Sequence, residues 1–231
     1  MFKTIWMVII CGAAIVPLLN TAVAQESEMN RDLSAVKLEN VHLKSGTLSQ
    51  ALSRLSVSYD IPIGLEVSLN DEDVPVIADF DKVSVKDLLN HIFDKNRNYT
   101  WKVNDGVINV FPVGNDRDRV IDKLLETEIG HFSVEPGSAC SEVAASLVNT
   151  PELKNFLATY KLSYRQADLS GFYIRSVGRK FRMDVSNMKL GSIMNKIVSE
   201  SSTAKYWFIS RNGIDPQTFT IGCGAKPESS N

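Results

Sequence analysis

The sequence lacks the residue clusters on which most enzymes and metal sites depend. It has three histidines, His42, His91 and His131, and none has a second histidine, a cysteine or a carboxylate at metal-ligand spacing. It also contains no Gly-x-Ser-x-Gly motif, no phosphate-binding loop and no glycine-rich nucleotide turn. We therefore predict a protein that is not an enzyme and that binds no cofactor and no metal.

An excess of charge of one sign is missing as well. The 25 Lys and Arg residues and the 27 Asp and Glu residues give a formal net charge of −2, and both signs are mixed along the whole chain. Without a basic stripe or a block of one charge, neither nucleic acid nor a membrane surface is an expected partner. The composition, 44% hydrophobic and 23% charged, is typical of a globular protein.

Long apolar runs are absent except at the N-terminus. Lys3 precedes an apolar run over residues 5–19, and Thr21-Ala22-Val23-Ala24 then leads to Gln25. This is the pattern of a secretory signal peptide, residues 1–24, with cleavage between Ala24 and Gln25. A retained membrane anchor is the alternative, but the run is shorter than the roughly 20 residues that span a bilayer as a helix. We predict a periplasmic or secreted protein with no stable membrane span after processing.

Cysteine is scarce beyond the predicted signal peptide, where only Cys140 and Cys223 occur. An exported chain meets oxidising conditions, and an even number of cysteines permits one disulfide between these two residues. The alternative is a pair of buried thiols.

What the chain does contain is an internal repeat. Residues 36–112 and 129–224 each follow the order strand, helix, strand, strand, helix, strand, strand. Each copy ends in a Trp-bearing strand, residues 99–103 and 205–209, followed by a Gly-containing turn and a last strand. The apolar faces of the helices also repeat, with spacing i, i+3, i+4, i+7 in the first helix of each copy. The matched first-helix faces are Leu48, Ala51, Leu52 and Leu55 in one copy and Cys140, Val143, Ala144 and Leu147 in the other.

This repeat predicts an α+β fold of two tandem lobes, each with two helices packed on a small mixed sheet. Residues 25–35 are then a leader, 113–128 a linker with an interlobe hinge, and 225–231 a tail. The second copy is longer between its helices, where Thr150 and Pro151 predict the start of an extra helix, followed by a hairpin around Ser170-Gly171. The inserted segment either adds only packing or shapes a binding surface specific to this lobe.

The first copy resembles a known periplasmic module. The residues that carry the likeness are Ser45-Gly46-Thr47-Leu48-Ser49-Gln50-Ala51-Leu52, Val83-Ser84-Val85-Lys86-Asp87-Leu88-Leu89 and Tyr99-Thr100-Trp101. Over residues 36–112 the chain is similar to the short N-terminal (STN) domain of secretins and TonB-dependent signal-transducing receptors. The second copy is similar only in element order and apolar spacing.

The resemblance implies a small α+β periplasmic domain that binds other proteins without catalysis. Because the sequence ends at Asn231 without the outer-membrane barrel of those families, we expect a free-standing module, accessory to an envelope assembly or to a secretion or uptake system. The expected contact is an edge strand that accepts a partner strand, formed by Val107, Asn109 and Phe111.

Two other function classes stay open at this point. One is binding of peptidoglycan or another cell-wall glycan through aromatic and arginine residues of the second lobe. The other is a hydrolase whose site is assembled from residues far apart in the sequence. The sequence does not identify the envelope partner.

Overall fold

The computed structural model describes residues 32–68, 74–166, 176–211 and 215–225. The predicted cleavage site between Ala24 and Gln25 and the predicted hairpin around Ser170-Gly171 lie outside these residues. Of the predicted tail, only Ala225 is described, and it is the last residue of a strand.

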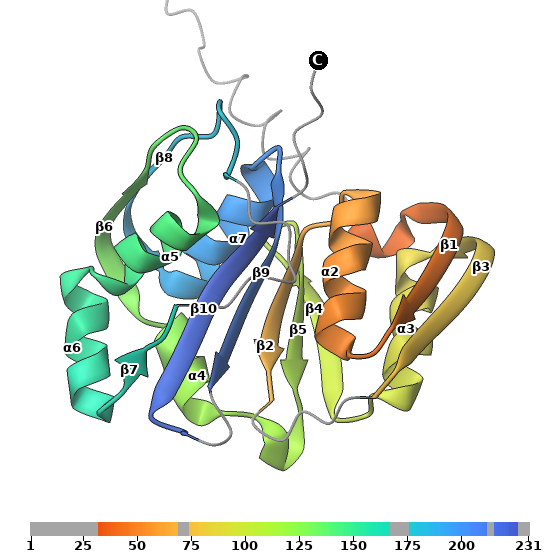
Figure 1. Cartoon of the computed structure of the whole chain (residues 1–231), viewed down its shortest axis with the longest axis horizontal. Helices are drawn as coiled ribbons and strands as arrows, with labels where there is room; N and C mark the ends of the chain where they lie inside the picture. The colour runs from red at the N-terminus through yellow and green to blue at the C-terminus, as the bar shows by residue number, and fades with distance from the viewer. Residues whose placement is uncertain (1–31, 69–73, 167–175, 212–214, 226–231) are drawn as a thin grey trace, which may run out of the picture. The chain divides into compact units, whose positions relative to one another are not determined.

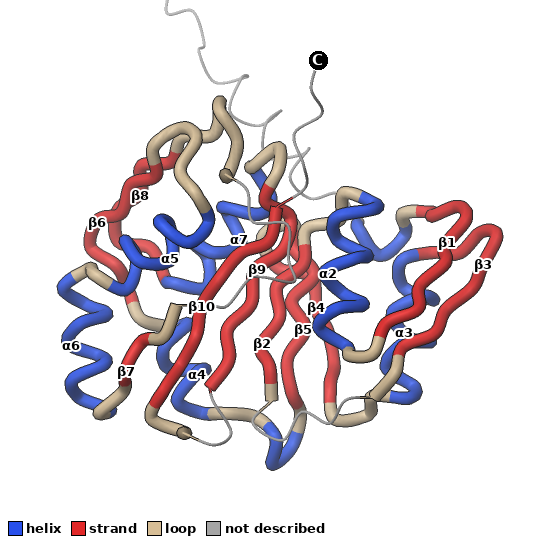
Figure 2. The backbone as a smooth tube through the Cα atoms, in the orientation of Figure 1, coloured by secondary structure: helices blue, strands red, loops and turns tan. Residues whose placement is uncertain are grey.

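The described chain is a mixed α+β structure, which confirms the predicted fold class (Figures 1 and 2). After a short 3-10 turn, η1 (Leu33–Ala35), the first half contains β1 (Lys37–Ser45), α2 (Leu48–Tyr59), β2 (Ile63–Val67), β3 (Val76–Ser84), α3 (Val85–Lys95), β4 (Tyr99–Asn104) and β5 (Val107–Pro112). Between the halves lie η2 (Gly114–Asp116) and α4 (Arg119–Leu125). The second half contains β6 (Glu128–Val134), α5 (Cys140–Val148), α6 (Pro151–Tyr160), β7 (Ser163–Tyr164), β8 (Met183–Lys189), α7 (Leu190–Glu200), β9 (Ala204–Arg211) and β10 (Thr218–Ala225).

Local sequence signals start the helices. The Thr47 side chain accepts a hydrogen bond from the backbone N–H of Gln50, and the Ser84 side chain accepts one from Asp87, so both residues cap a helix N-terminus. The extra helix α6 has Pro151 at its first position. Thr150 does not cap it, because its hydroxyl donates back to the carbonyl of Leu147 at 2.8 Å.

The strands form one six-stranded mixed sheet, in the order β4-β5-β2-β9-β10-β7, and two separate two-stranded ribbons, β1-β3 and β6-β8. The pairing pattern of the two halves is the same: β4 and β5 are antiparallel and β5 and β2 parallel, while β9 and β10 are antiparallel and β10 and β7 parallel. Strands β2 and β9 then pair with each other in parallel. The prediction of two separate lobes, each on its own sheet, is therefore wrong, because this pairing joins the halves into a single sheet.

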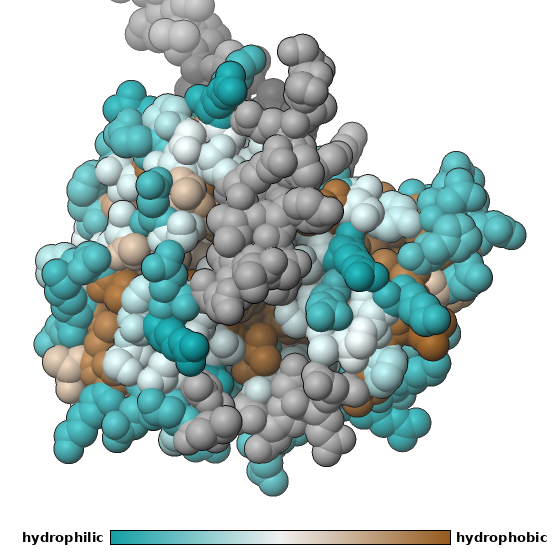
Figure 3. All heavy atoms as spheres, in the orientation of Figure 1, coloured by the Kyte–Doolittle hydropathy of each residue, from teal (hydrophilic) through white to brown (hydrophobic). Residues whose placement is uncertain are grey.

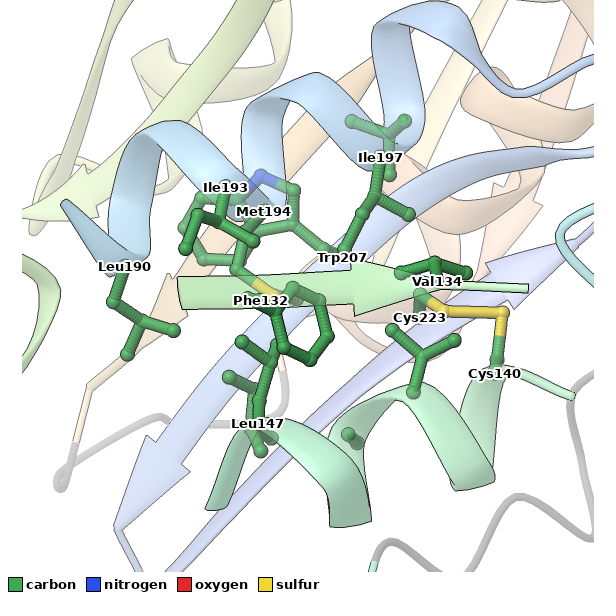
Figure 4. Packing of buried hydrophobic residues seen from close by; sticks show 14 of the residues in the cluster. Phe132, Val134, Cys140, Leu147, Leu190, Ile193, Met194, Ile197, Trp207 and Cys223 are labelled. Atoms are coloured by element: carbon green, nitrogen blue, oxygen red, sulfur yellow. A yellow bond between two sulfur atoms is a disulfide. The ribbon is translucent and has the colours of Figure 1, made fainter. Parts of the chain in front are cut away.

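Helices of the two halves cover opposite faces of the shared sheet. In β9, Tyr206 belongs to the apolar cluster around α2, and its hydroxyl lies 3.1 Å from that of Ser49 in α2. The next residue, Trp207, belongs to the other cluster and donates its indole N–H to Asn195 of α7 at 2.9 Å. Because successive strand residues point to opposite faces, α2 and α7 lie on opposite sides of β9. Figure 4 shows the second cluster, in which α5 and α7 pack around Trp207.

The predicted linker, residues 113–128, is not a hinge. It contains η2 and α4, and the α4 side chains Ile121 and Leu124 are 2% and 0% exposed. Asp118 caps α4 and also forms an ion pair with Arg211 of β9, with 2.9 Å between Arg211 Nη1 and Asp118 Oδ2. These contacts hold the segment against the second apolar cluster, the one around Trp207. The chain from Asp32 onward forms one compact unit.

Candidate functional site

The strand predicted as the partner-binding edge is internal. β5, which carries Val107, Asn109 and Phe111, pairs with β4 on one side and with β2 on the other. The prediction was wrong because the order of strands along the chain does not give their order in a sheet, and β2 inserts next to β5. Within the six-stranded sheet, the end strands are β4 and the two-residue β7, so the long strand of that sheet with one unpaired side is β4.

The β4–β5 turn determines which backbone groups of β4 face outward. Asp105 and Gly106 have φ values of 51° and 68°, as in the two-residue turns that fit the twist of a hairpin. The flanking residues Asn104 and Val107 then form a hydrogen-bonded pair. Along an antiparallel ladder such pairs alternate with pairs that are not hydrogen-bonded to each other, so Lys102 with Asn109 is the next hydrogen-bonded pair. The bond from Val113 N–H to the Asn98 carbonyl, 2.8 Å long, fits this alternation. Trp101 and Val103, at the intervening positions, therefore direct their backbone N–H and C=O groups away from β5.

A polar cleft lies on the face of β4, β5 and β2 that carries Lys102, Asn109 and Glu66. Its volume is about 230 Å³. Its walls come from both halves and from the segment between them. Lining residues include Glu66, Lys102, Asp105, Arg117, Asn195 and Trp207. Helix α2 lies on the opposite face of β2. The face with the cleft is covered only in part by α4 and α7, so the cleft is open.

Most charged groups of the cleft have a partner. The guanidinium of Arg117 donates to both carboxylate oxygens of Asp122 at 2.9 Å, and this hydrogen bond raises the pKa of Arg117. Lys189 Nζ lies 2.5 Å from Glu126 Oε2. Asp105, in the β4–β5 turn, accepts weaker bonds from the neutral side chains of α7 at 3.3 and 3.4 Å. Those two donors are Ser192 and Asn195.

Glu66 differs from the other carboxyls of the cleft. Its half-buried side chain accepts no hydrogen bond from any side chain in the described part of the molecule. Burial is the largest cause that raises the pKa of Glu66 to about 7, and the Asp122 carboxylate raises it further, against the opposing effect of Arg117 and Lys102. A carboxyl in this position exchanges its proton near neutral pH.

The predicted edge residues take part in this face. Asn109 is 8% exposed and lines the cleft. The ring of Phe111 lies beneath two cations, with 5.3 Å from its centroid to Lys102 Nζ and 5.1 Å to the guanidinium carbon of Arg117. Contacts of this kind between cations and aromatic rings are attractive. They position Lys102 and Arg117 beside the cleft.

Trp207 forms an inner wall of the cleft and is 2% exposed. Gly64 of β2 lies against it, and a Cβ atom at this position would overlap the indole atoms Cε2, Cζ2 and Nε1. Glycine is therefore needed where β2 and β9 meet. Trp101, which holds the corresponding position in β4, is half-buried and packs against the α2 cluster.

The remaining predicted site residues are placed as follows. Cys140, the first residue of α5, and Cys223 of β10 are joined in a disulfide (Figure 4). His42 and His131 each lie beside an aspartate of the neighbouring strand. Over the described ranges, no group of three or more His, Cys, Asp or Glu side chains is arranged to hold a metal ion. None of the helices described is long and apolar enough to cross a membrane.

Comparisons with known proteins give no relative. No family model, no curated protein and no solved structure matches the chain. The resemblance of residues 36–112 to the STN domain therefore stays a prediction.

Sequence reasoning missed the cleft. The alternation of Ile61, Ile63 and Leu65 places Glu66 on the opposite face of a strand, which is ordinarily a solvated face. The only local signal is Gly64 followed by Glu66 on that same face, next to a run of apolar residues. Nothing in the sequence shows that Arg117, Asp122 and Asn195 come from distant positions to enclose it.

Proposed function

We propose that the mature protein is an exported, non-catalytic interaction module of the cell envelope, accessory to an assembly, secretion or uptake system. Its partner adds a strand along β4. The observation that supports this proposal is the free side of β4, where the backbone groups of Trp101 and Val103 point outward and the Val103 side chain is 36% exposed. Unpaired groups of this kind accept a partner strand.

Two of the other described edges are less suited to strand addition. β7, at the far end of the six-stranded sheet, contains two residues. The β1–β3 ribbon carries exposed cross-strand pairs, Lys82 with Glu39 and His42 with Asp79. Hydrophilic side chains cover much of this ribbon at the right of Figure 3. Charged side chains on an edge disfavour further pairing.

The test substitutes Val103. In Val103→Pro the outward N–H is lost while the bonds to β5 remain, because Pro is tolerated on an edge strand. Val103→Thr is the matched control, since it keeps the N–H and a β-branched side chain. Both variants, carrying an affinity tag, are crosslinked in intact cells, and captured envelope proteins are quantified by mass spectrometry.

We expect the wild type and Val103→Thr to capture the same envelope protein. The captured amount should fall at least tenfold with Val103→Pro, which corresponds to a loss of about 1.4 kcal/mol in binding free energy. Equal capture by a Val103→Pro variant with unchanged circular dichroism would exclude β4 as the contact. If the wild type and both variants instead sediment with purified sacculi to the same extent, the glycan alternative is favoured.

Export is tested separately. N-terminal sequencing of protein recovered from the periplasm is expected to begin at Gln25, because Ala22 and Ala24 provide the small residues that signal peptidase requires. A mature protein that retains Met1 and sediments with membranes would contradict the proposed location.

A further inference from the structure

The cleft has an imbalance in its charge pairing. Its carboxyls are Glu66, Asp105, Asp122 and Glu126, and its cations are Lys102, Arg117 and Lys189. The ion pairs Arg117–Asp122 and Lys189–Glu126 use two of each. Two carboxyls, Glu66 and Asp105, have no cation hydrogen-bonded to them among the described residues, and one cation, Lys102, lies over the ring of Phe111.

An unpaired carboxylate in a partly enclosed cleft favours a cationic ligand. Removing Glu66 from bulk water costs free energy that no described donor offsets, and a ligand cation would supply charge-assisted hydrogen bonds, which are stronger than those of neutral donors. Arg117 does not meet this need, because both of its bonds to Asp122 are at 2.9 Å. A ligand anion would meet an excess of carboxyls, four against three cations, which disfavours it.

We infer that the cleft is a binding site for a primary ammonium or guanidinium group, which pairs with the carboxylate of Glu66. Asn109 and Asp105 provide further acceptors on the same walls. The volume of about 230 Å³ holds the end of an arginine or lysine side chain or a small diamine.

This site is separate from the proposed edge-strand contact. β2 lies two strands in from the free side of β4, and neighbouring strands are about 4.8 Å apart. Glu66 is therefore about 10 Å from the β4 backbone and farther from any strand added beside it. A strand added beside β4 would lie on the side of β4 away from β5 and β2, while Lys102 of β4 lines the cleft.

Binding of a cation is expected to depend on pH. Charged groups that act on Glu66 come from β4, from the segment before α4 and from α4 itself; they are Lys102, Arg117, Asp118 and Asp122. The pKa of about 7 means that Glu66 is protonated in the free protein at mildly acidic pH. A cation that binds the carboxylate must then displace a proton, so that affinity rises with pH to about 7 and levels off above it.

The experiment is isothermal titration calorimetry on the mature protein with three probes. N-acetyl-arginine amide represents a peptide side chain, 1,5-diaminopentane represents a small amine, and N-acetyl-citrulline amide is the uncharged isostere of the first. Titrations at about pH 6 in two buffers of different ionisation enthalpy count the protons released, with about 0.4 expected for a tenfold preference for the carboxylate and up to about 0.9 for a much larger one. The relative affinities of the peptide and amine probes distinguish the two sources of the cation.

We expect the charged probes to bind at least tenfold more tightly than the citrulline probe, and Glu66→Gln to lose at least tenfold at about pH 8 together with its pH dependence. Glu39→Gln, at an exposed carboxyl of β1, is the control and should bind as the wild type does. Fluorescence of Trp207 in the cleft wall provides a second readout. Absence of binding by folded wild-type protein, equal binding of the citrulline probe, or full binding by Glu66→Gln would overturn the inference.

Discussion

The contact between Gly64 and Trp207 makes the junction of the two halves sensitive to a single methyl group. A Cβ atom on Gly64 would overlap three atoms of the indole ring. The ring has little freedom to move, because it is 2% exposed and its N–H donates to Asn195 Oδ1 at 2.9 Å. In Gly64→Ala either β2 and β9 separate or Trp207 leaves its hydrogen bond.

Both responses lower the free energy of unfolding. Overpacking a core costs about 1–3 kcal/mol, and a buried amide left without its partner costs about 1–3 kcal/mol. The gain from replacing glycine by alanine within a strand is about 0.5–1 kcal/mol. We therefore expect Gly64→Ala to destabilise the protein by up to about 2.5 kcal/mol, measured by urea unfolding followed by far-UV circular dichroism.

A double-mutant cycle identifies the cause. Trp207→Leu removes the atoms that a new Cβ would meet, at a cost of its own of about 3 kcal/mol. In that background Gly64→Ala should cost less than about 0.5 kcal/mol or should stabilise the protein. If Gly64→Ala costs the same in both backgrounds, then the indole contact is not the reason for glycine at this position. The control is Gly46→Ala, where a Cβ would meet only the flexible side-chain oxygen of Gln50 at 3.8 Å.

Three further predictions concern the disulfide, the ion pair and the buried acid. Replacing Cys140 and Cys223 together by Ala should lower the free energy of unfolding by about 4.5 kcal/mol by the loop-entropy model for a separation of 83 residues; a reductant should shift the urea midpoint of the wild type only. Asp118→Ala should cost about 3 kcal/mol, because Arg211 and Asp118 are 15% and 9% exposed, while Asp118→Asn keeps the cap and should cost less. Burial raises the pKa of Glu66 in the folded protein to about 7, above its ordinary value of 4.5, so its contribution to stability is present below about pH 4.5 and is lost as the pH rises through 7. Urea unfolding at several pH values should therefore show Glu66→Gln matching the wild type at low pH and exceeding it by up to about 3 kcal/mol above pH 7; parallel pH profiles would contradict this sign.

Features set by neighbouring residues could be predicted from the sequence. The face of α3 follows from the spacing of Val85, Leu88 and Leu89, all fully buried, and the cap of that helix follows from Ser84. The order of elements in both halves follows for the same reason, since periodicity is a local signal. The fold class was correct because it depends on these elements alone.

Features set by residues far apart in the chain could not be predicted. Pairing of β2 with β9 brings Gly64 beside Trp207, and neither strand has a local signal for the other. That pairing turns two expected lobes into one sheet, and the insertion of β2 beside β5 makes the expected edge strand internal. The Cys140–Cys223 disulfide was one of two alternatives, because an even cysteine count permits a bridge without requiring it.

The cleft follows from the shared sheet, because the halves place their helices on opposite faces. In the first half, α2 covers one face of β2. The other face is covered in part by α4 and by the N-terminal part of α7, which both follow β5 in the chain. Glu66 thus stands on a strand of one half and faces Asp122 of α4, while Asp105 of the first half meets Asn195 of the second. A first half folded alone would leave Glu66 and Asn109 on a solvated sheet face, where no burial would raise the pKa of the acid. Any chemistry of this cleft therefore requires both halves.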